Sequence, residues 1–498
     1  MWQRRPAHAD APYHPYDLLA RKAEALELLG RLDEVVALLQ ANIARAAVSG
    51  DTRRLAAAHR ALGDVYIERG DFDCAVKEAG AARDLYASGG DALGIAESER
   101  TIGSALVRKG RYQEARQHLS RSLELHESAG NRRGMARALN YIGVLHWNRG
   151  EYQEALDRYR RSLAISEELQ DQRDINIAAG NIGLLHWTMG EYPLAMEWLQ
   201  RKLALSRRTG DQISLGYAFN NIGLVYLDTG DSGRALECFQ QHHQLCQRQG
   251  DKSGKARAFN NMGLAHIRQG RYGEALKLFT AYYELSVQIG EPKGVALACG
   301  NIGDVHFLTG NYTAAASFVE RQLAIADEIG DKRLLANAQF NLGRIHQWRG
   351  DLQQAAPLLT NSVNAFRALG NAAELIDAMN SLTAALLALG RRQEAAAQNE
   401  EALSLAGPAT LPDLRRESLL LQAIILAGED PTAATQALES LAMESGPARH
   451  RADVQYELHR LTGGDGARVA ALALYRSLSG GDANAQTGQR IAELGSPF

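Results

Sequence analysis

Histidine recurs at a fixed step of forty residues along this chain, and histidine is the commonest metal-ligating side chain in proteins. The five members of this ladder are His146, His186, His266, His306 and His346. Ligands of one metal ion lie about 2 Å from it. Residues one repeat apart on packed helices lie roughly 10 Å apart or more, which is the spacing of neighbouring helix axes. We therefore interpret the histidines as structural and expect no metal site.

Asparagine recurs at the same step, at two adjacent positions, although it is a poor residue for the interior of a helix. These positions hold Asn140, Asn181, Asn220, Asn221, Asn260, Asn261, Asn301, Asn341 and Asn380. An amide offers both a donor and an acceptor, so it can pair with a peptide backbone in either sense. Two interpretations stay open: the asparagines bind a peptide, or they cap and cross-link neighbouring helices.

Catalytic and nucleotide-binding motifs do not accompany these residues. The run from Gly250 to Lys255 is similar to a phosphate loop, but it is one residue short, lacks the following Ser or Thr and has no preceding strand. HExxH and GxSxG motifs are missing. The four cysteines form no CxxC pair, which is typical of reduced thiols. We expect no catalytic residues, no enzyme activity and no cofactor.

A forty-residue period organises the elements that carry these residues. Ten glycines keep the step from Gly30 to Gly390, and nine alanines keep it from Ala75 to Ala395. Apolar residues at helical spacing predict two amphipathic helices in each period. A strict period of this length is typical of a solenoid, in which each helix pair buries its apolar face against its neighbours. The sequence therefore predicts an all-α solenoid.

Glycine followed by Asp or Asn marks most junctions between periods, as in Gly130-Asn131 and Gly210-Asp211. Glycine tolerates the positive φ that ends one helix, and the next side chain can cap the following helix. Gln170 stands where glycine is expected, so we predict a strained or open turn there.

Four regions follow from the period and from its decay. An N-terminal extension covers 1–15, the periodic array covers 16–406, degenerate capping helices cover 407–479, and a mobile tail rich in Gly, Asn, Gln and Ser covers 480–498. The capping region contains four predicted helices: Leu411–Leu426, Pro431–Met443, Ala448–Leu461 and Ala467–Leu478.

An aliphatic-glycine pair recurs in the first helix of each period, as in Leu62-Gly63, Ile142-Gly143 and Ile222-Gly223. Tyr or His follows three residues later in most periods, and the second helix supplies the alanines. This pattern resembles the tetratricopeptide repeat, or TPR. The long period is similar to that of the LGN/Pins polarity adaptors and kinesin light chain. The resemblance implies a right-handed superhelix of about ten helix pairs.

The resemblance also implies a binding groove, because the first helix of each TPR faces the concave surface. In related long-repeat adaptors, equivalent asparagines hold an extended peptide by its main chain. Besides the asparagines, the matching positions hold Leu184, Leu224, Leu264, Asp304, Trp147, Trp187, Leu227, Ile267 and Phe307. Trp147, Trp187 and Phe307 would provide apolar anchors, although tryptophan is also common in cores.

Two arginines, Arg257 and Arg268, flank Asn260 and Asn261 and could hold an acidic group. The basic residues are otherwise scattered, so the carboxylate clamp of chaperone-binding TPRs is incomplete here.

Composition narrows the class of partner. The net charge is −3, from 55 basic and 58 acidic residues, and no long basic run occurs, so we expect neither nucleic acid nor membrane as a partner. No apolar run reaches the roughly 18 residues of a membrane span, and no secretory signal is evident, so we expect a cytoplasmic protein.

The sequence predicts a non-catalytic scaffold or adaptor that binds an extended peptide segment of a protein partner. The alternative is a regulatory sensor that switches an effector on binding a peptide or a small ligand.

Overall fold

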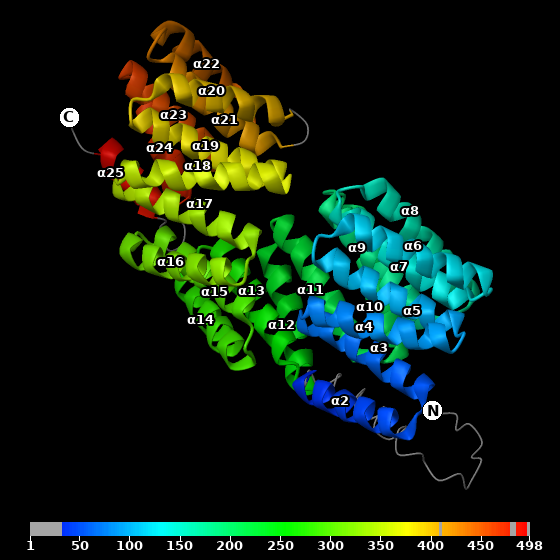
Figure 1. The fold of residues 1–498 in the computed structure, drawn as a ribbon. Coiled ribbons are helices and arrows are strands. Elements are labelled where there is room, and N and C mark those ends of the chain that lie inside the picture. The colour runs from blue at the N-terminus through cyan, green and yellow to red at the C-terminus, as the bar shows by residue number, and fades with distance from the viewer. Residues whose placement is uncertain (1–31, 408–410, 479–484, 496–498) are drawn as a thin grey trace. The chain divides into compact units, whose positions relative to one another are not determined.

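The computed structural model describes residues 32–407, 411–478 and 485–495. These residues form 24 α-helices and no strand, and helices that follow one another in sequence pack side by side (Figure 1). The predicted all-α solenoid is therefore confirmed. The predicted extension at 1–15 and the beginning of the array at 16–31 lie outside the described residues.

The periodic array consists of α2 and nine helix pairs that run from α3/α4 to α19/α20. The first helices are α3 (Thr52–Arg69), α5 (Ala92–Arg108), α7 (Arg132–Asn148), α9 (Gln172–Thr188), α11 (Gln212–Asp228), α13 (Lys252–Arg268), α15 (Pro292–Leu308), α17 (Lys332–Arg349) and α19 (Ala372–Ala388). The second helices are α2 (Leu32–Ser49), α4 (Phe72–Ser88), α6 (Tyr112–Ser128), α8 (Tyr152–Glu168), α10 (Tyr192–Thr209), α12 (Ser232–Gln249), α14 (Tyr272–Ile289), α16 (Tyr312–Glu328), α18 (Leu352–Leu369) and α20 (Arg392–Leu405).

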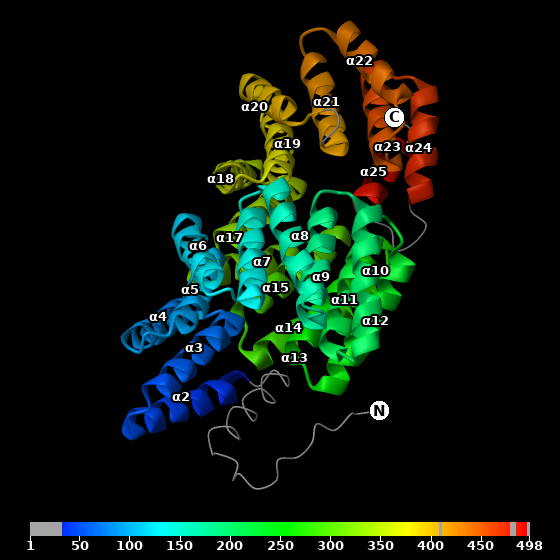
Figure 2. The same cartoon turned by 90° about the vertical axis from the view of Figure 1, so that its right-hand side faces the viewer.

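The chain divides into two compact units, unit 1 up to Ala258 and unit 2 from Phe259 onward, and the boundary lies within α13. Unit 1 contains α2 to α12. Unit 2 contains α14 to α25, and its helices from α17 to α24 can be followed in Figure 2.

The turns between repeats form as their residues predict. Gly130 has a φ of 63°, and the side chain of Asn131 then accepts a hydrogen bond of 3.1 Å from the backbone N–H of Gly134. Every other predicted Gly-Asp or Gly-Asn junction has the same cap. Gln170 has a φ of 53° and is the only non-glycine residue with positive φ among the described ones. The predicted strain at this turn is therefore confirmed.

Close packing within most pairs requires a mid-helix glycine in the first helix. A Cβ atom added at Gly223 would lie 2.5 Å from the ring of Phe239, and one added at Gly143 would lie 2.5 Å from the ring of Tyr159. Both rings are fully buried. The glycine thus lets a large second-helix side chain approach the first-helix backbone, which sets the packing distance of the pair.

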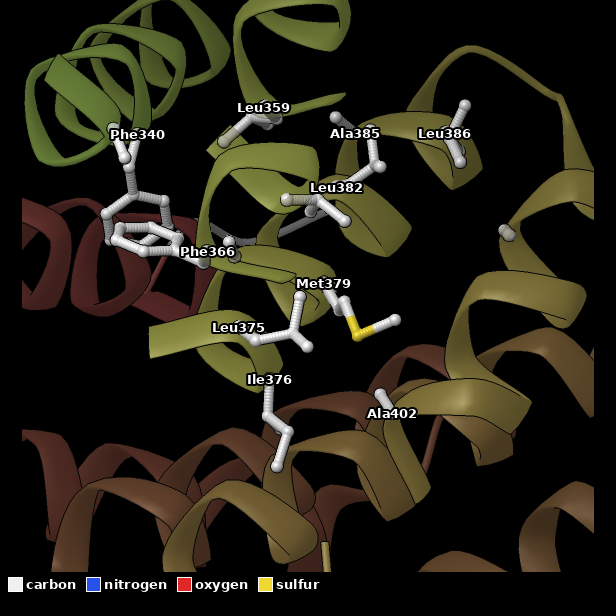
Figure 3. Packing of buried hydrophobic residues seen from close by; sticks show 14 of the residues in the cluster. Phe340, Leu359, Phe366, Leu375, Ile376, Met379, Leu382, Ala385, Leu386 and Ala402 are labelled. Atoms are coloured by element: carbon white, nitrogen blue, oxygen red, sulfur yellow. The ribbon is translucent and has the colours of Figure 1, made fainter. Parts of the chain in front are cut away.

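One hydrophobic core of unit 2 lies between α17, α18, α19 and α20 (Figure 3). The rings of Phe340 and Phe366 meet edge to face, with centroids 6.4 Å apart. Leu375, Ile376 and Met379 continue this core along α19. These side chains hold three successive helices of the array in fixed register.

The capping helices match their predictions within two residues: α21 (Pro412–Leu426), α22 (Pro431–Met443), α23 (Ala448–Thr462) and α24 (Asp465–Leu478). The last region differs from the mobile tail expected over 480–498, because Ala485–Gly495 forms a further helix, α25. Leu494 of α25 is buried beside Tyr456 and Tyr475. The sequence of this segment is mostly polar, and so the few apolar residues through which this short helix docks did not predict a helix.

Candidate functional site

The asparagine positions form hydrogen bonds between neighbouring repeats. In unit 1, the Nδ2 of Asn181 donates to the Oδ1 of Asn140 over 2.9 Å, which joins α9 to α7. In unit 2, the Nδ2 of Asn301 donates to the Oδ1 of Asn260 over 2.6 Å, which joins α15 to α13. These four residues therefore cross-link helices, which is one of the two roles that the sequence left open.

The remaining asparagines of the predicted groove differ in their surroundings. Asn220 and Asn261 are buried, at 4% and 5% exposure. Asn220 donates to its neighbour Asn221 over 3.2 Å, and Asn260 donates to Asn261 over 3.1 Å. Asn341 is half-buried and lines a cavity described below. The set therefore does not present a uniform row of amides.

The aromatic positions of the predicted groove are largely packed. Trp147 is half-buried against the core around α8 and α9. The indole N–H of Trp187 donates to the carboxylate of Asp228 over 2.8 Å. Phe307 belongs to the core at 5% exposure, and the guanidinium of Arg344 lies 5.1 Å from its ring centre. Phe307 thus packs inside the repeat.

The leucines and arginines of the predicted groove have ordinary surroundings. Leu184, Leu224 and Leu264 are all half-buried. Arg257, in unit 1, is exposed, and its guanidinium lies 5.4 Å from the ring centre of Tyr217. Arg268, in unit 2, is exposed at the end of α13.

The histidines contact their own repeat. His146 contacts Glu151 at 2.6 Å and His186 contacts Glu191 at 2.5 Å, and both glutamates precede the second helix of the pair. His306 stacks on Phe318 at a centroid distance of 5.7 Å, and burial lowers its pKa. Among the described residues, no group of three His, Cys, Asp or Glu could hold a metal ion. These contacts give the histidines a role in fixing the turn within a pair.

Sequence reasoning missed a cavity in unit 2, which we call the acidic cavity. Its volume is about 270 Å³. Three successive first helices, α15, α17 and α19, provide most of its walls. It is lined by Leu297, Gly300, Asn301, Asp304, Gln322, Leu334, Asn337, Phe340, Asn341, Phe366, Glu374 and Asp377. The signal in the sequence was the presence of acids, Asp304 and Asp377, at positions that hold uncharged or basic residues in most other repeats.

Two of the three carboxylates that line this cavity lack close cationic partners, whereas the third, Glu374, pairs with Arg333 over 2.6 Å. Asp304 and Asp377 form no ion pair within 4 Å and no hydrogen bond with any described residue. Burial raises the pKa of Asp304 to about 6, and it raises the pKa of Asp377 as well, while Arg344 opposes both shifts. Asp304 and Asp377 are half-buried. The atoms of the cavity wall surround their carboxyl groups and exclude water, so burial still raises their pKa values although the cavity is open.

Glu417 of α21 adds another carboxyl group close to Asp377. Burial, and then repulsion from Asp377, raises the pKa of Glu417 to about 7, while Arg344 and Arg449 oppose the shift. Arg344, which also acts on Asp304 and Asp377, lies over two rings: its guanidinium is 5.1 Å from the centre of Phe307 and 5.4 Å from that of Phe340. The region therefore carries excess negative charge.

A glycine in the first helix leaves room for a polar side chain of the second helix to lie against it, as Gln322 does in the acidic cavity. A Cβ atom added at Gly300 would lie 2.7 Å from the Nε2 of Gln322. Gly180 of unit 1 has the same relation to Lys202, whose Nζ would lie 2.8 Å from the added Cβ. Burial lowers the pKa of Lys202 to about 8. In both repeats, glycine replaces the asparagine found at this position in α7, α11 and α13.

A larger cavity, of about 520 Å³, lies in unit 1 beside α4 and α6. Four of its charged side chains form two pairs: the guanidinium of Arg83 contacts Asp84 at 2.9 Å, and the Nε of Arg111 donates to Glu114 over 2.7 Å. Because most of its charges are compensated locally, we place the candidate site in the acidic cavity of unit 2.

None of the described helices is both long and apolar enough to cross a lipid bilayer. Comparison with curated protein sequences gave no match.

Solved structures provide three relatives in fold. A Rap protein complexed with Competence and Sporulation Factor is 14% identical, with a TM-score of 0.51, and the match covers 73% of this chain and all of that one. The apo form of the quorum sensor NprR from B. thuringiensis is 16% identical, with a TM-score of 0.50, over 72% of this chain and 98% of that one.

The third is a signal transduction ATPase (STAND) protein with a tetratricopeptide repeat sensor from Pyrococcus horikoshii. It is 16% identical, with a TM-score of 0.47, over 66% of this chain. This chain spans only 52% of the length of that protein.

A family model described as the tetratricopeptide repeat matches residues 94–168, 174–248, 214–288, 295–360 and 334–406. These ranges cover more than half of the chain and contain first helices that line the acidic cavity. With the recurring glycines and the stacked helix pairs, they show that the chain belongs to the tetratricopeptide repeat family.

Proposed function

We propose that this chain is a non-catalytic interaction module that binds an extended segment of a partner protein along its first helices. The observation that carries the proposal is the acidic cavity, because three successive repeats contribute polar side chains to one opening. Asn301, Asn337 and Asn341 line it together with apolar residues. A cavity with apolar walls and a few convergent polar groups is the usual form of a ligand site.

Relatives in fold support a peptide or protein as the ligand. The Rap protein was solved in complex with Competence and Sporulation Factor. Amides on the walls suit an extended peptide, because the main chain of such a peptide presents alternating donors and acceptors that an asparagine side chain can match.

Selection from a library of random peptides tests this function. Peptides of about twelve residues span roughly 40 Å when extended, which is enough to reach across several repeats. We expect selected peptides to bind the wild-type protein and to bind Asn341→Ala more weakly, since a hydrogen bond from a buried amide contributes about 1 kcal/mol. Anisotropy of a labelled peptide measures both affinities.

The matched control is Asn364→Ala, which changes an asparagine on the second helix α18 outside the cavity. Equal binding by the wild-type protein and Asn341→Ala, with no variant of a cavity residue affecting affinity, would place the binding surface elsewhere.

A regulatory sensor is the second candidate. The similarity in fold to the quorum sensor NprR favours it, because a ligand that binds one conformation of a protein better than another shifts the population toward that conformation. A change in the radius of gyration on adding a selected peptide, measured by small-angle scattering, distinguishes a sensor from a rigid scaffold.

A further inference from the structure

The acidic cavity has the composition of a pocket for a long side chain that ends in a cation. Leu297, Leu334 and Phe366 provide apolar wall, while Asp304 and Asp377 provide carboxylates on the same lining. A lysine or arginine side chain has the complementary form, with an aliphatic stem and a cationic head.

The negative charges around the cavity are only partly neutralised by the cationic side chains of the described residues. Glu374 shares one of its oxygens, Oε1, with the Nη2 of Arg333 over 2.6 Å. Asp304 and Asp377 have no cation within 4 Å among the described residues. Arg344 is the cation that acts electrostatically on both, and its guanidinium lies over aromatic rings. An added cation would therefore gain electrostatic energy here.

Buried acceptors on the lining point to the same class of ligand, independently of the charge. The Oε1 of Gln322 is buried in a residue that is only 4% exposed, and it accepts no hydrogen bond from any described residue. The Oε2 of Glu374 is likewise buried and accepts none from the described part of the chain. Buried polar atoms nearly always find a partner. Both atoms are acceptors, so the partner that would satisfy them is a donor.

The position of the Gln322 side chain depends on the absence of a side chain at Gly300. Its amide lies against Gly300, where a Cβ atom would come within 2.7 Å of Nε2 and 2.8 Å of Oε1. A side chain at residue 300 would displace the amide from the lining. The glycine thus places an acceptor beside the carboxylates at the cost of a residue that weakens the helix.

We propose that the acidic cavity binds one lysine or arginine side chain of the partner segment, an inference that rests on the function proposed above. The cationic head donates to Asp304, Asp377 and Gln322, and the aliphatic stem packs on the apolar wall. Arginine suits the pocket best, because its guanidinium carries five N–H donors for several acceptors at once.

The test uses peptides selected on the wild-type protein and then synthesised with acetylated N-termini, so that the only cations are side chains. Each peptide is also made with its basic residues replaced one at a time by glutamine. Affinities are measured for the wild-type protein, for Asp304→Asn/Asp377→Asn, and for a matched control, Asp327→Asn/Glu328→Gln. The control removes the same charge from exposed positions of α16.

We expect the selected peptides to share a basic residue at one position. Replacing it should weaken binding to the wild-type protein by about tenfold or more, the effect of losing a hydrogen bond to a charged group. The same replacement should have little effect on binding to Asp304→Asn/Asp377→Asn. The control variant should behave as the wild type.

Four results would overturn the proposal. If peptides bind but no basic position matters, or if the cavity variant discriminates as the wild type does, the cationic pocket is wrong while peptide binding stands. If acetylation alone abolishes binding, the cation is the peptide's amino terminus. If no peptide binds the wild-type protein, the proposed function fails together with this inference.

Discussion

At the scale of single residues, side chains that share a repeat position have different roles. Asn181 and Asn301 cross-link helices, and Asn301 also lines the acidic cavity, whereas Asn341 lines the cavity without forming a bond between repeats among the described residues. Gly300 and Gly180 occupy the asparagine position and admit Gln322 and Lys202 instead. The sequence shows the ladder, but the role of each member depends on which neighbour its side chain contacts, and this is decided by rotamers and by residues one repeat away.

Replacing Asp304 by asparagine should stabilise the protein near neutral pH. The raised pKa of Asp304 means that ionising this buried group costs more in the folded state than in the unfolded state. The cost builds up as pH rises from about 4 through 6. We expect Asp304→Asn to raise the free energy of unfolding by about 1–3 kcal/mol at pH 7.5 and by little at pH 4, on the scale of 1.36 kcal/mol per pKa unit.

Urea unfolding at a series of pH values measures this difference. Asp377 and Glu374 line the same cavity, and burial raises the pKa values of Asp377 and Glu417 as well. The exposed Glu328→Gln, which changes a carboxylate outside the cavity, serves as the control. A variant that is less stable than the wild type at every pH would show that Asp304 has a structural partner.

At the scale of elements, the sequence predicts the helices and their turns closely. The segment Pro431–Met443 is predicted and observed with identical bounds, because proline begins the helix and the apolar spacing fixes its extent. Helix α25 was not predicted, because it docks through only a few apolar residues, such as Leu494, which give no clear helical pattern. The acidic cavity escapes it because its walls come from three helices that lie forty residues apart in sequence.

The turn at Gln170 allows a reciprocal test of the repeat geometry. Gln170 has the left-handed φ that glycine has in other repeats, so Gln170→Gly should raise the free energy of unfolding by about 1 kcal/mol. Gly130 has a φ of 63° and open space around it, so Gly130→Gln should lower it by a similar amount. Urea unfolding compares the two variants with the wild type. Changes of equal sign in both would contradict the account of these turns.

At the scale of the whole molecule, each repeat contacts mainly its neighbours, so stability is approximately a sum of repeat and interface terms. The hydrogen bond between Asn301 and Asn260 is one such interface term, and it lies wholly within unit 2. Asn341 takes part in no bond of this kind among the described residues. The ladder therefore contains both structural and ligand-facing asparagines in the same unit.

Two alanine variants separate these roles through local stability. Asn301→Ala removes a bond between repeats and leaves Asn260 without that donor, so we expect a loss of about 1–2 kcal/mol in the free energy of opening. Asn341→Ala should leave stability unchanged or slightly higher, because alanine is the better helix former. Hydrogen exchange followed by mass spectrometry locates the effect: protection should fall in α13 and α15 for Asn301→Ala and should not change in α3 to α9 of unit 1 for either variant. Equal losses of protection for both variants would mean that Asn341 also holds the repeats together, and its weaker peptide binding would then no longer identify a binding residue.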